Sequence, residues 1–315
     1  MLWTRYTRTR FFIRDKLNCV PALGALLSLL FLCSCGTDHS SRTRLPAPIT
    51  INSGAGHRGP LLVMIGLQSG EELPFLLDTG APVTCLDNSL EPRLGKRLGT
   101  VTGSNFGVVH EVSVYEAPQL WLGHTPLTML GTNVITWNFK QGPSKGPHPY
   151  VGILGMHVLL NYCIQLDFAA NRMRFVDPAP ADRSAWGTCF ALTDVGDGCL
   201  AIRENLVGAP GPGSLIDTGY RGDGFLTPEL FQRWTNHSAP ALEEEIRAPK
   251  ARLGGEIYPD VIYLNAESLS LGDPPRPFNG IGLYFLSRHL VTFDFPNHTM
   301  YLKRTRVSPL KGAGS

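Results

Sequence analysis

Apolar residues along the chain form many short runs separated by turn-forming residues. One apolar stretch, 19–32, lies near the N-terminus and precedes a polar segment, 36–58, rich in Ser, Thr, Pro and Gly. From about Leu61, and again from about Cys189, short apolar runs alternate with turns that contain Gly or Pro. Long helical periodicities are scarce, and the chain holds 34 Gly and 25 Pro residues. This pattern predicts an all-β fold built of short strands.

The second part of this pattern repeats the first. The triplet Asp-Thr-Gly occurs twice, at 78–80 and 217–219, and each copy ends a short apolar run. Further on, the stretch 153–173 is echoed without gaps 127 positions later, at 280–300. The recurring residues are Gly155, Leu159, Asp167, Phe168 and Met173 in the first copy and Gly282, Leu286, Asp294, Phe295 and Met300 in the second. A repeat period above about 100 residues indicates a duplicated domain rather than a solenoid.

The repeat divides the folded part of the chain into two lobes. We predict an N-terminal lobe over 59–177 and a C-terminal lobe over 178–303, joined by a Pro-rich junction. A basic tail, 304–315, follows. Within each lobe the expected order is a strand ending in the triplet, a Gly-bearing hairpin, an apolar-apolar-Gly step, a short helix and a terminal hairpin.

Two hairpins follow the triplets and are candidates for flaps, meaning hairpins that cover a bound substrate. The first, 99–114, contains Gly103 and Gly107, and the second, 248–263, contains Gly254 and Gly255 at its tip. Glycine at a hairpin tip supplies positive φ and mobility. An ordinary connecting hairpin is the alternative at both places.

The first 35 residues have the features of a targeting segment. Residues 1–34 carry a net charge of +4. Because the full chain has a net charge of +2, the residues after 34 carry −2. The apolar stretch 19–32 is short for a membrane span and suits the apolar part of a signal peptide. It ends in a bacterial lipobox-like sequence whose cysteine, Cys35, would be lipidated. An uncleaved anchor and plain secretion are alternatives, and all three predict export, with 36–58 as a tether.

Export makes disulfides possible. Cys189 and Cys199 flank a turn-rich stretch and could bridge a hairpin, whereas Cys85 and Cys163 suit small core positions. The sequence has no Cys-x-x-Cys and no His-Glu-x-x-His, so we predict neither a metal nor another cofactor. It also lacks a basic stripe with interleaved aromatics, which argues against nucleic acid as a partner.

The two triplets and the later apolar-apolar-Gly steps resemble those of the aspartic peptidases. The resemblance spans nearly all of residues 60–303. It implies a bilobal all-β fold, two β-barrel-like lobes with the active cleft between them, and a monomer that holds both lobes in one chain. Asp78 and Asp217 would form the catalytic dyad. Two carboxylates about 3 Å apart cannot both be ionised, so they share one proton. One of them then acts as a base on a water molecule, while the other protonates the scissile carbonyl.

The same resemblance gives roles to the rest of each triplet. Thr79 and Thr218 would hydrogen-bond across the lobe junction. Gly80 and Gly219 would let the backbone approach the carboxylates.

The chain departs from the pepsin-like pattern just after the triplets. Ala81 and Tyr220 stand where those enzymes carry Ser or Thr, and Ala81 is similar to the retropepsin pattern. Losing a hydrogen bond to the charged acid should raise the apparent pKa of the pair. We therefore predict a pH optimum less acidic than that of a gastric-type enzyme. The first hairpin also lacks a tyrosine near its tip, where Phe106 is the nearest aromatic residue.

These features predict an exported, lipid-anchored aspartic endopeptidase that takes an extended peptide or protein substrate. A catalytically silent envelope lipoprotein that binds peptides with the same fold is the alternative from another class. An enzyme specialised for one envelope protein is a second alternative.

Overall fold

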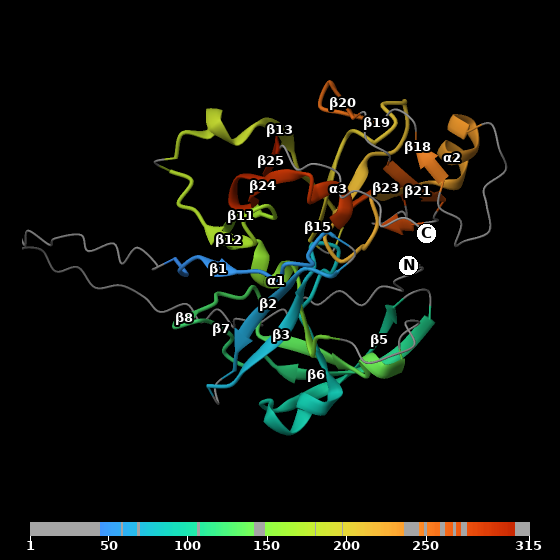
Figure 1. The fold of residues 1–315 in the computed structure, drawn as a ribbon. Helices are drawn as coiled ribbons and strands as arrows, with labels where there is room; N and C mark the ends of the chain where they lie inside the picture. The colour runs from blue at the N-terminus through green and yellow to red at the C-terminus, as the bar shows by residue number, and fades with distance from the viewer. Residues whose placement is uncertain are drawn as a thin grey trace, which may run out of the picture.

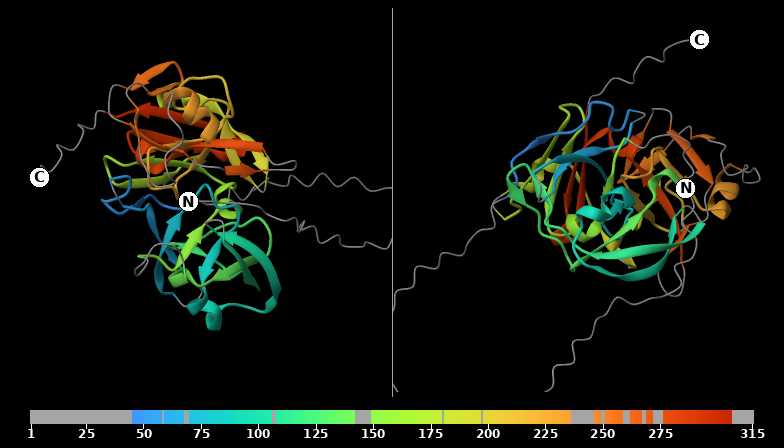
Figure 2. Two further views of the ribbon diagram at one scale, coloured as in Figure 1. Left: turned by 90° about the vertical axis from the view of Figure 1, so that its right-hand side faces the viewer. Right: turned by 90° about the horizontal axis from the view of Figure 1, so that it is seen from below.

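The protein folds into two β-rich lobes that lie one above the other in Figure 1. This computed structural model describes residues 45–57, 59–67, 70–105, 108–141, 149–179, 181–196, 198–235, 246–248, 251–258, 262–266, 269–271 and 276–305. The N-terminal lobe is blue to green, and the C-terminal lobe is yellow to red. Figure 2 shows the same two-lobed arrangement from the side and from below. The predicted all-β bilobal fold is confirmed.

The N-terminal lobe is built on a nine-stranded sheet in the order β5-β6-β9-β4-β10-β3-β2-β7-β8. Its strands are β2 (Leu62–Gly66), β3 (Glu72–Leu77), β4 (Cys85–Asp87), β5 (Arg97–Asn105), β6 (Val108–Glu116), β7 (Trp121–Leu122), β8 (Thr125–Pro126), β9 (Asn133–Trp137) and β10 (Gly152–Leu154). The short helices η1 (Asn88–Arg93), η2 (Phe139–Gln141) and α1 (Met156–Leu159) lie between strands.

The C-terminal lobe repeats this plan with an eight-stranded sheet in the order β14-β15-β16-β23-β17-β21-β18, in which β22 also pairs with β23. The strands are β14 (Thr193–Gly196), β15 (Cys199–Ile202), β16 (Ser214–Asp217), β17 (Gly224–Leu226), β18 (Ile246–Ala248), β21 (Ile262–Ala266), β22 (Leu269–Leu271) and β23 (Arg276–Gly282). A separate hairpin joins β19 (Ala251–Leu253) to β20 (Glu256–Tyr258), and the helices are α2 (Pro228–Thr235) and α3 (Leu283–Leu286). Both lobe sheets are open over the described residues, so the β-barrel-like description of the lobes was too strong.

A six-stranded sheet joins the two lobes, in the order β1-β12-β11-β24-β25-β13. Its strands are β1 (Ile49–Thr50), β11 (Cys163–Asp167), β12 (Arg172–Phe175), β13 (Thr188–Ala191), β24 (His289–Asp294) and β25 (Thr299–Arg304). The hairpins β11–β12 and β24–β25 lie at the ends of the two copies of the ungapped sequence repeat, and β11 pairs antiparallel with β24.

The centre of that pairing lies between two equivalent residues. Gln165 is opposite Thr292, and these two positions are themselves separated by the period of the repeat. The Gln165 amide donates a 2.7 Å hydrogen bond to the Thr292 hydroxyl, and both residues are buried. The approximate twofold axis relating the lobes therefore passes through this pair.

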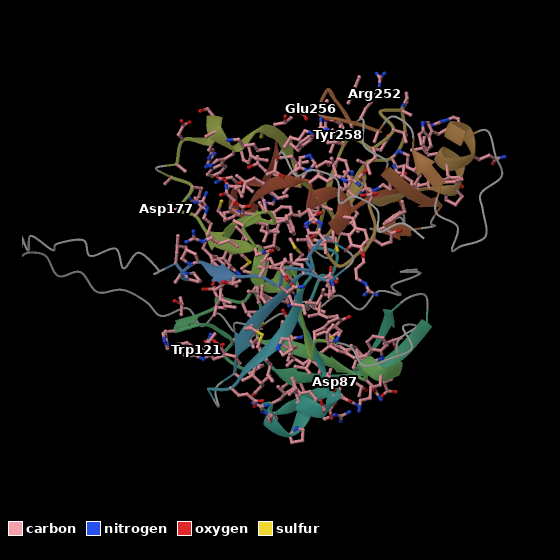
Figure 3. All side chains as sticks on the ribbon, in the orientation of Figure 1. Asp87, Trp121, Asp177, Arg252, Glu256 and Tyr258 are labelled. Carbon is pink, nitrogen blue, oxygen red and sulfur yellow. The ribbon has the colours of Figure 1, made fainter. Side chains whose placement is uncertain are left out.

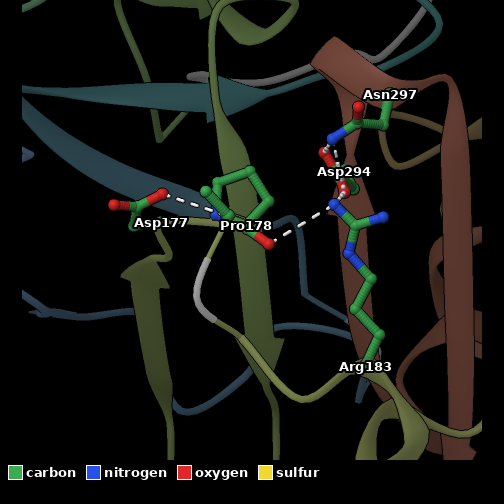
Figure 4. A network of polar contacts seen from close by, with 6 residues as sticks. Asp177, Pro178, Arg183, Asp294 and Asn297 are labelled. Carbon is green, nitrogen blue, oxygen red and sulfur yellow. Dashed lines mark hydrogen bonds and ion pairs between the residues drawn. The ribbon is translucent and has the colours of Figure 1, made fainter.

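The junction between the lobes is fixed by a buried ion pair. Helix η3 (Arg183–Trp186) follows the junction, and the Arg183 guanidinium lies 3.2 Å from the fully buried Asp294 carboxylate. The Asn297 amide donates to both oxygens of Asp294, and Arg183 also donates to the Pro178 carbonyl, as Figure 4 shows. Asn297 belongs to η4 (Phe295–Asn297). The short linker is thus tied to the β24–β25 hairpin.

Part of the segment assigned to a tether belongs to the fold. Ile51 and Ala55 are buried, and β1 pairs with β12. The Ser287 hydroxyl, just after α3, donates to the Gly56 carbonyl at 3.1 Å. Residues 45–57 therefore pack on both lobes, which corrects the predicted tether 36–58 over that range. The signal segment with Cys35, the start of the tether and most of the basic tail lie outside the described residues.

The predicted disulfide is also wrong. Cys189 and Cys199 carry thiols and are not bonded to each other. The apolar runs that they start enter different sheets: Cys189 lies on β13, opposite Tyr301 in the six-stranded sheet, and Cys199 lies on β15 in the C-terminal lobe. Cys85 and Cys163 are buried, as predicted. Within the described part of the chain, no helix is long and apolar enough to cross a membrane.

Candidate active site

Both triplets begin at equivalent strand ends. Asp78 directly follows β3 and Asp217 is the last residue of β16. Each of these strands has a parallel neighbour, β10 beside β3 and β23 beside β16, and each neighbour pairs on its other side with an antiparallel strand. The two triplets therefore leave the sheets in equivalent places and meet at the lobe junction.

The two threonines lock the triplets together by reciprocal hydrogen bonds. The Thr79 amide donates to the Thr218 hydroxyl, and the Thr218 amide donates to the Thr79 hydroxyl, both at 3.0 Å. Each hydroxyl in turn donates to a carbonyl of the opposite lobe, Thr79 to Ile216 and Thr218 to Leu77, both at 2.8 Å. Both threonines are buried, so these bonds are shielded from water. This is the cross-lobe role predicted for Thr79 and Thr218.

The glycine of each triplet packs against the aspartate of the other. A Cβ atom on Gly80 would lie 2.6 Å from Cγ of Asp217, and one on Gly219 would lie 2.5 Å from Cγ of Asp78. A side chain at either position would displace the carboxylate of the opposite lobe. Glycine here serves close approach between the two turns, as predicted.

Backbone amides orient the two carboxylates. The Gly80 amide donates to Asp78 at 2.8 Å, while the amides of Gly219 and Tyr220 both donate to Asp217 at 2.9 Å. Asp78 and Asp217 are only partly exposed and hydrogen-bond to each other. The geometry brings together all six residues of the two triplets.

Burial and mutual repulsion favour a proton on this pair. Burial, followed by the negative charge of Asp78, raises the pKa of Asp217 to about 8. Burial also raises the pKa of Asp78, but amide hydrogen bonds and the hydrogen bond from Asp217 oppose that rise. The pair therefore retains one proton at pH values where an ordinary carboxylic acid has lost it.

Two residues near the dyad were missed from the sequence. Tyr150 precedes β10, and burial, followed by the charge of Asp78, raises its pKa to about 12. Its ring lies edge-on to Phe139, at 5.7 Å between centroids. The thiol of Cys199, which belongs to the C-terminal lobe, lies 3.6 Å from the Gly80 carbonyl oxygen of the N-terminal lobe. Spacing after the triplet gives no signal for either residue, because both reach the site through the arrangement of the sheets.

The two flap candidates differ in position. The first hairpin is present as β5–β6 with Gly103 on β5, whereas Phe106 and Gly107 lie outside the described residues. The second has Gly254 and Gly255 at its tip with φ of 60° and 78°, in line with the expected positive φ. However, Gly254 packs against Thr188 and Phe190 of β13. Figure 3 shows Arg252, Glu256 and Tyr258 at the end of the C-terminal lobe away from the N-terminal lobe. The flap prediction for Gly254 and Gly255 is therefore wrong.

Comparison with solved structures identifies the architecture. The chain is similar to an aspartic proteinase from Irpex lacteus, with a TM-score of 0.52 and 14% identity over 82% of this chain and 97% of that one. The fold is that of the aspartic proteinases. The basic 7S globulin from soybean matches with a TM-score of 0.54 and 12% identity, covering 84% of this chain and 96% of the globulin. Conglutin gamma, a basic 7S globulin from lupine seeds, matches with a TM-score of 0.51 and 11% identity, covering 82% and 95%.

These similarities concern the fold alone, since the identities do not exceed 14%. No protein-family model and no curated protein sequence matches the chain. Of the three structures named here, one is a proteinase and two are globulins, so the fold by itself does not indicate activity.

Proposed function

We propose that this protein is an aspartic endopeptidase whose catalytic dyad is Asp78 and Asp217. The observation that carries the proposal is the hydrogen-bonded pair of carboxylates, held between two turns that are locked by reciprocal threonine bonds. Such a pair retains one proton over a wide pH range, which is the state that this chemistry requires.

We assign the shared proton to Asp217, whose pKa is raised by burial and by the charge of Asp78, and this assignment gives each acid a role. Asp78, ionised, takes a proton from a water held between the carboxylates, and the resulting hydroxide attacks the scissile carbonyl carbon. Asp217 gives its proton to the carbonyl oxygen, so a neutral tetrahedral diol forms. Proton transfer to the leaving amine then breaks the C–N bond and restores one proton on the dyad. We expect an extended peptide to occupy the site, paired with strand edges at the lobe junction.

The proposal is tested by replacing the acids while keeping their shape. Asp78→Asn and Asp217→Asn should each lower kcat/KM on a diverse peptide library by at least about 1000-fold. Asp167→Asn is the matched control, because this partly exposed aspartate lies in a β11–β12 turn, where it accepts from the Ala170 amide. Equal cleavage by the wild type and both dyad variants would refute the assignment. A wild type that binds peptides and cleaves none of them would support the silent binding protein instead.

We also propose that the chain is exported and anchored through Cys35. The support is the basic segment before the apolar stretch 19–32 and the lipobox-like sequence that follows it. Cys35→Ala should abolish incorporation of labelled fatty acid in a bacterial host and release the protein from the membrane fraction. Unchanged labelling would exclude Cys35 as the modified residue.

A further inference from the structure

The residue Gly80 is held by contacts at its amide, its Cα and its carbonyl. Its amide donates to Asp78 at 2.8 Å, and its Cα faces the Asp217 carboxylate so closely that a Cβ would lie 2.6 Å from Cγ. Its carbonyl receives the third contact, the Cys199 thiol at 3.6 Å, a distance within the range of a sulfur hydrogen bond. Cys199 is 3% exposed and lies on β15 of the opposite lobe. The thiol therefore connects the C-terminal lobe to the turn that carries Asp78.

This contact breaks the twofold symmetry of the site. In the N-terminal lobe Leu62 pairs with Leu76, two residues before Asp78, and in the C-terminal lobe Ala201 pairs with Leu215, two residues before Asp217. Leu62 and Ala201 are thus equivalent, with the same separation in sequence as the two triplets. By that separation Pro60 is the N-terminal-lobe equivalent of Cys199. Proline has neither an N–H nor a side-chain donor, so position 60 cannot repeat the contact on Gly219.

The segment around Cys199 is seated against the N-terminal lobe. Gly198, with φ of 80°, lies next to the Leu160 side chain at the end of α1, where a Cβ would be 3.6 Å from Leu160 Cδ1. Cys199 starts β15, which pairs with the Asp217 strand β16. The thiol is therefore placed by a strand that pairs with the Asp217 strand and by a turn that lies against the N-terminal lobe.

We propose that Cys199 is a positioning residue that holds the Asp78 turn in its catalytic geometry, an inference that rests on the proposed function. A hydrogen bond to the Gly80 carbonyl fixes the orientation of the Gly80–Ala81 peptide, whose Ala81 amide hydrogen-bonds to Asp78. It also polarises the turn next to Asp78, which favours the charged form of that acid. Among the described titratable groups, Asp217 and Tyr150 also interact with Asp78. Cys199 thus helps to make Asp78 the base and Asp217 the acid.

The test compares Cys199→Ala, which removes the donor, with Cys199→Ser, which keeps one. Cys163→Ala is the matched control, because Cys163 is equally buried at 3% exposure but lies in the six-stranded sheet. In Cys199→Ala we expect kcat to fall about 10-fold with KM within about 2-fold of wild type. The acid limb of the pH–rate profile, which reports ionisation of Asp78, should move to higher pH by about 0.5 unit. Cys199→Ser should restore both values, and Cys163→Ala should leave both unchanged.

A second measurement does not require peptide cleavage. The pH dependence of the unfolding free energy, compared between wild type and Asp78→Asn, reports the native-state titration of Asp78. Repeating the comparison in the Cys199→Ala background should show the same upward shift. If the wild type cleaves nothing but this shift is present, the proposed function fails and the role of Cys199 stands. If the titration is unchanged, or if Cys199→Ser and Cys199→Ala behave alike, the inference on Cys199 is overturned.

Discussion

The two triplet turns share one scaffold but differ in the contacts around it. The threonine bonds have the same lengths in both turns, and each glycine packs equally closely against the opposite carboxylate. The amide that follows each triplet donates to the aspartate carbonyl in both turns, from Ala81 to Asp78 and from Tyr220 to Asp217. Only the Asp78 turn receives the Cys199 thiol, because Pro60 occupies the equivalent position. Symmetric contacts place the acids, and one-sided contacts give them different chemistry.

The largest expected loss of stability comes from breaking the reciprocal threonine hydrogen bonds, which are the same in both turns. Thr79→Val and Thr218→Val each keep the volume but leave a buried amide and a buried carbonyl of the opposite turn unpaired. Each should lower the free energy of unfolding by about 4 kcal/mol. Urea unfolding at one fixed pH measures both variants. Because the contacts are reciprocal, the two losses should agree within about 1 kcal/mol, and a one-sided loss would contradict the symmetric lock.

The second prediction contrasts His289 with Tyr162, its counterpart in the N-terminal copy of the repeat. Burial lowers the pKa of His289 to about 4, and the ring contacts the Tyr258 hydroxyl at 3.0 Å and the Phe285 carbonyl at 3.1 Å. The unfolded chain binds this proton near pH 6.5 and the native site only near pH 4, so acidification favours unfolding. Stability present above pH 6.5 should fall by about 3 kcal/mol on reaching pH 4.

Replacing the histidine checks this assignment. His289→Gln should remove most of the decline between pH 6.5 and pH 4, as measured by urea unfolding across that range. Tyr162 has no imidazole, and its hydroxyl accepts from the Thr128 amide at 2.6 Å. Tyr162→Phe should therefore leave the slope unchanged, and an unaltered slope in His289→Gln would point to other groups.

A third contrast concerns Asp294 and its counterpart Asp167. Asp294 is fully buried beside Arg183, whereas Asp167 is partly exposed and accepts from the Ala170 amide. Arg183→Met should lower the free energy of unfolding by about 2 kcal/mol, because a buried carboxylate loses its cation but keeps its bonds to Asn297. Asp167→Asn should change it by less than about 1 kcal/mol. If urea unfolding gave the same loss of stability for Arg183→Met and Asp167→Asn, the ion pair at the buried Asp294 would not contribute more to stability than the exposed turn at Asp167.

The smallest expected effect concerns the residue after the first triplet. The pH–rate profile of the wild type should be bell-shaped, with activity lost above about pH 8 as Asp217 ionises and a peak above about pH 3. Ala81→Ser adds a hydroxyl next to Asp78 and should move the acid limb to lower pH by at most about 1 unit. A peak below about pH 3 in the wild type would contradict the expected effect of Ala81.

The sequence predicts what is repeated and misses what is particular to one lobe. The triplets and the ungapped echo downstream led correctly to two equivalent lobes, since the same residues recur at the same strand ends. The start of helix α2 also follows from local sequence, because Pro228 suits the first helical position and the Thr227 hydroxyl accepts from the Leu230 amide. These features depend on local pattern.

The wrong predictions, the disulfide and the second flap, both depended on which sheet a strand joins. A short apolar run does not show that Cys189 enters the six-stranded sheet while Cys199 enters the C-terminal lobe, so the pair looked like a hairpin disulfide. The hairpin with Gly254 was predicted correctly as a hairpin, but it packs on Phe190, which belongs to a strand much earlier in the chain. Contacts of that range are set by the whole fold rather than by local sequence.

The pairing of Gln165 with Thr292 has a consequence for the order in which the chain folds during synthesis. Every hydrogen bond between β11 and β24 joins the two copies of the repeat, so this pairing forms only after the second lobe has been synthesised. Until then the first lobe carries β11 with one edge unpaired, a surface to which another newly made chain can add. Because the axis makes that edge self-complementary, a chain truncated after β12 should pair with its own copy, and a lone lobe would fold as a dimer.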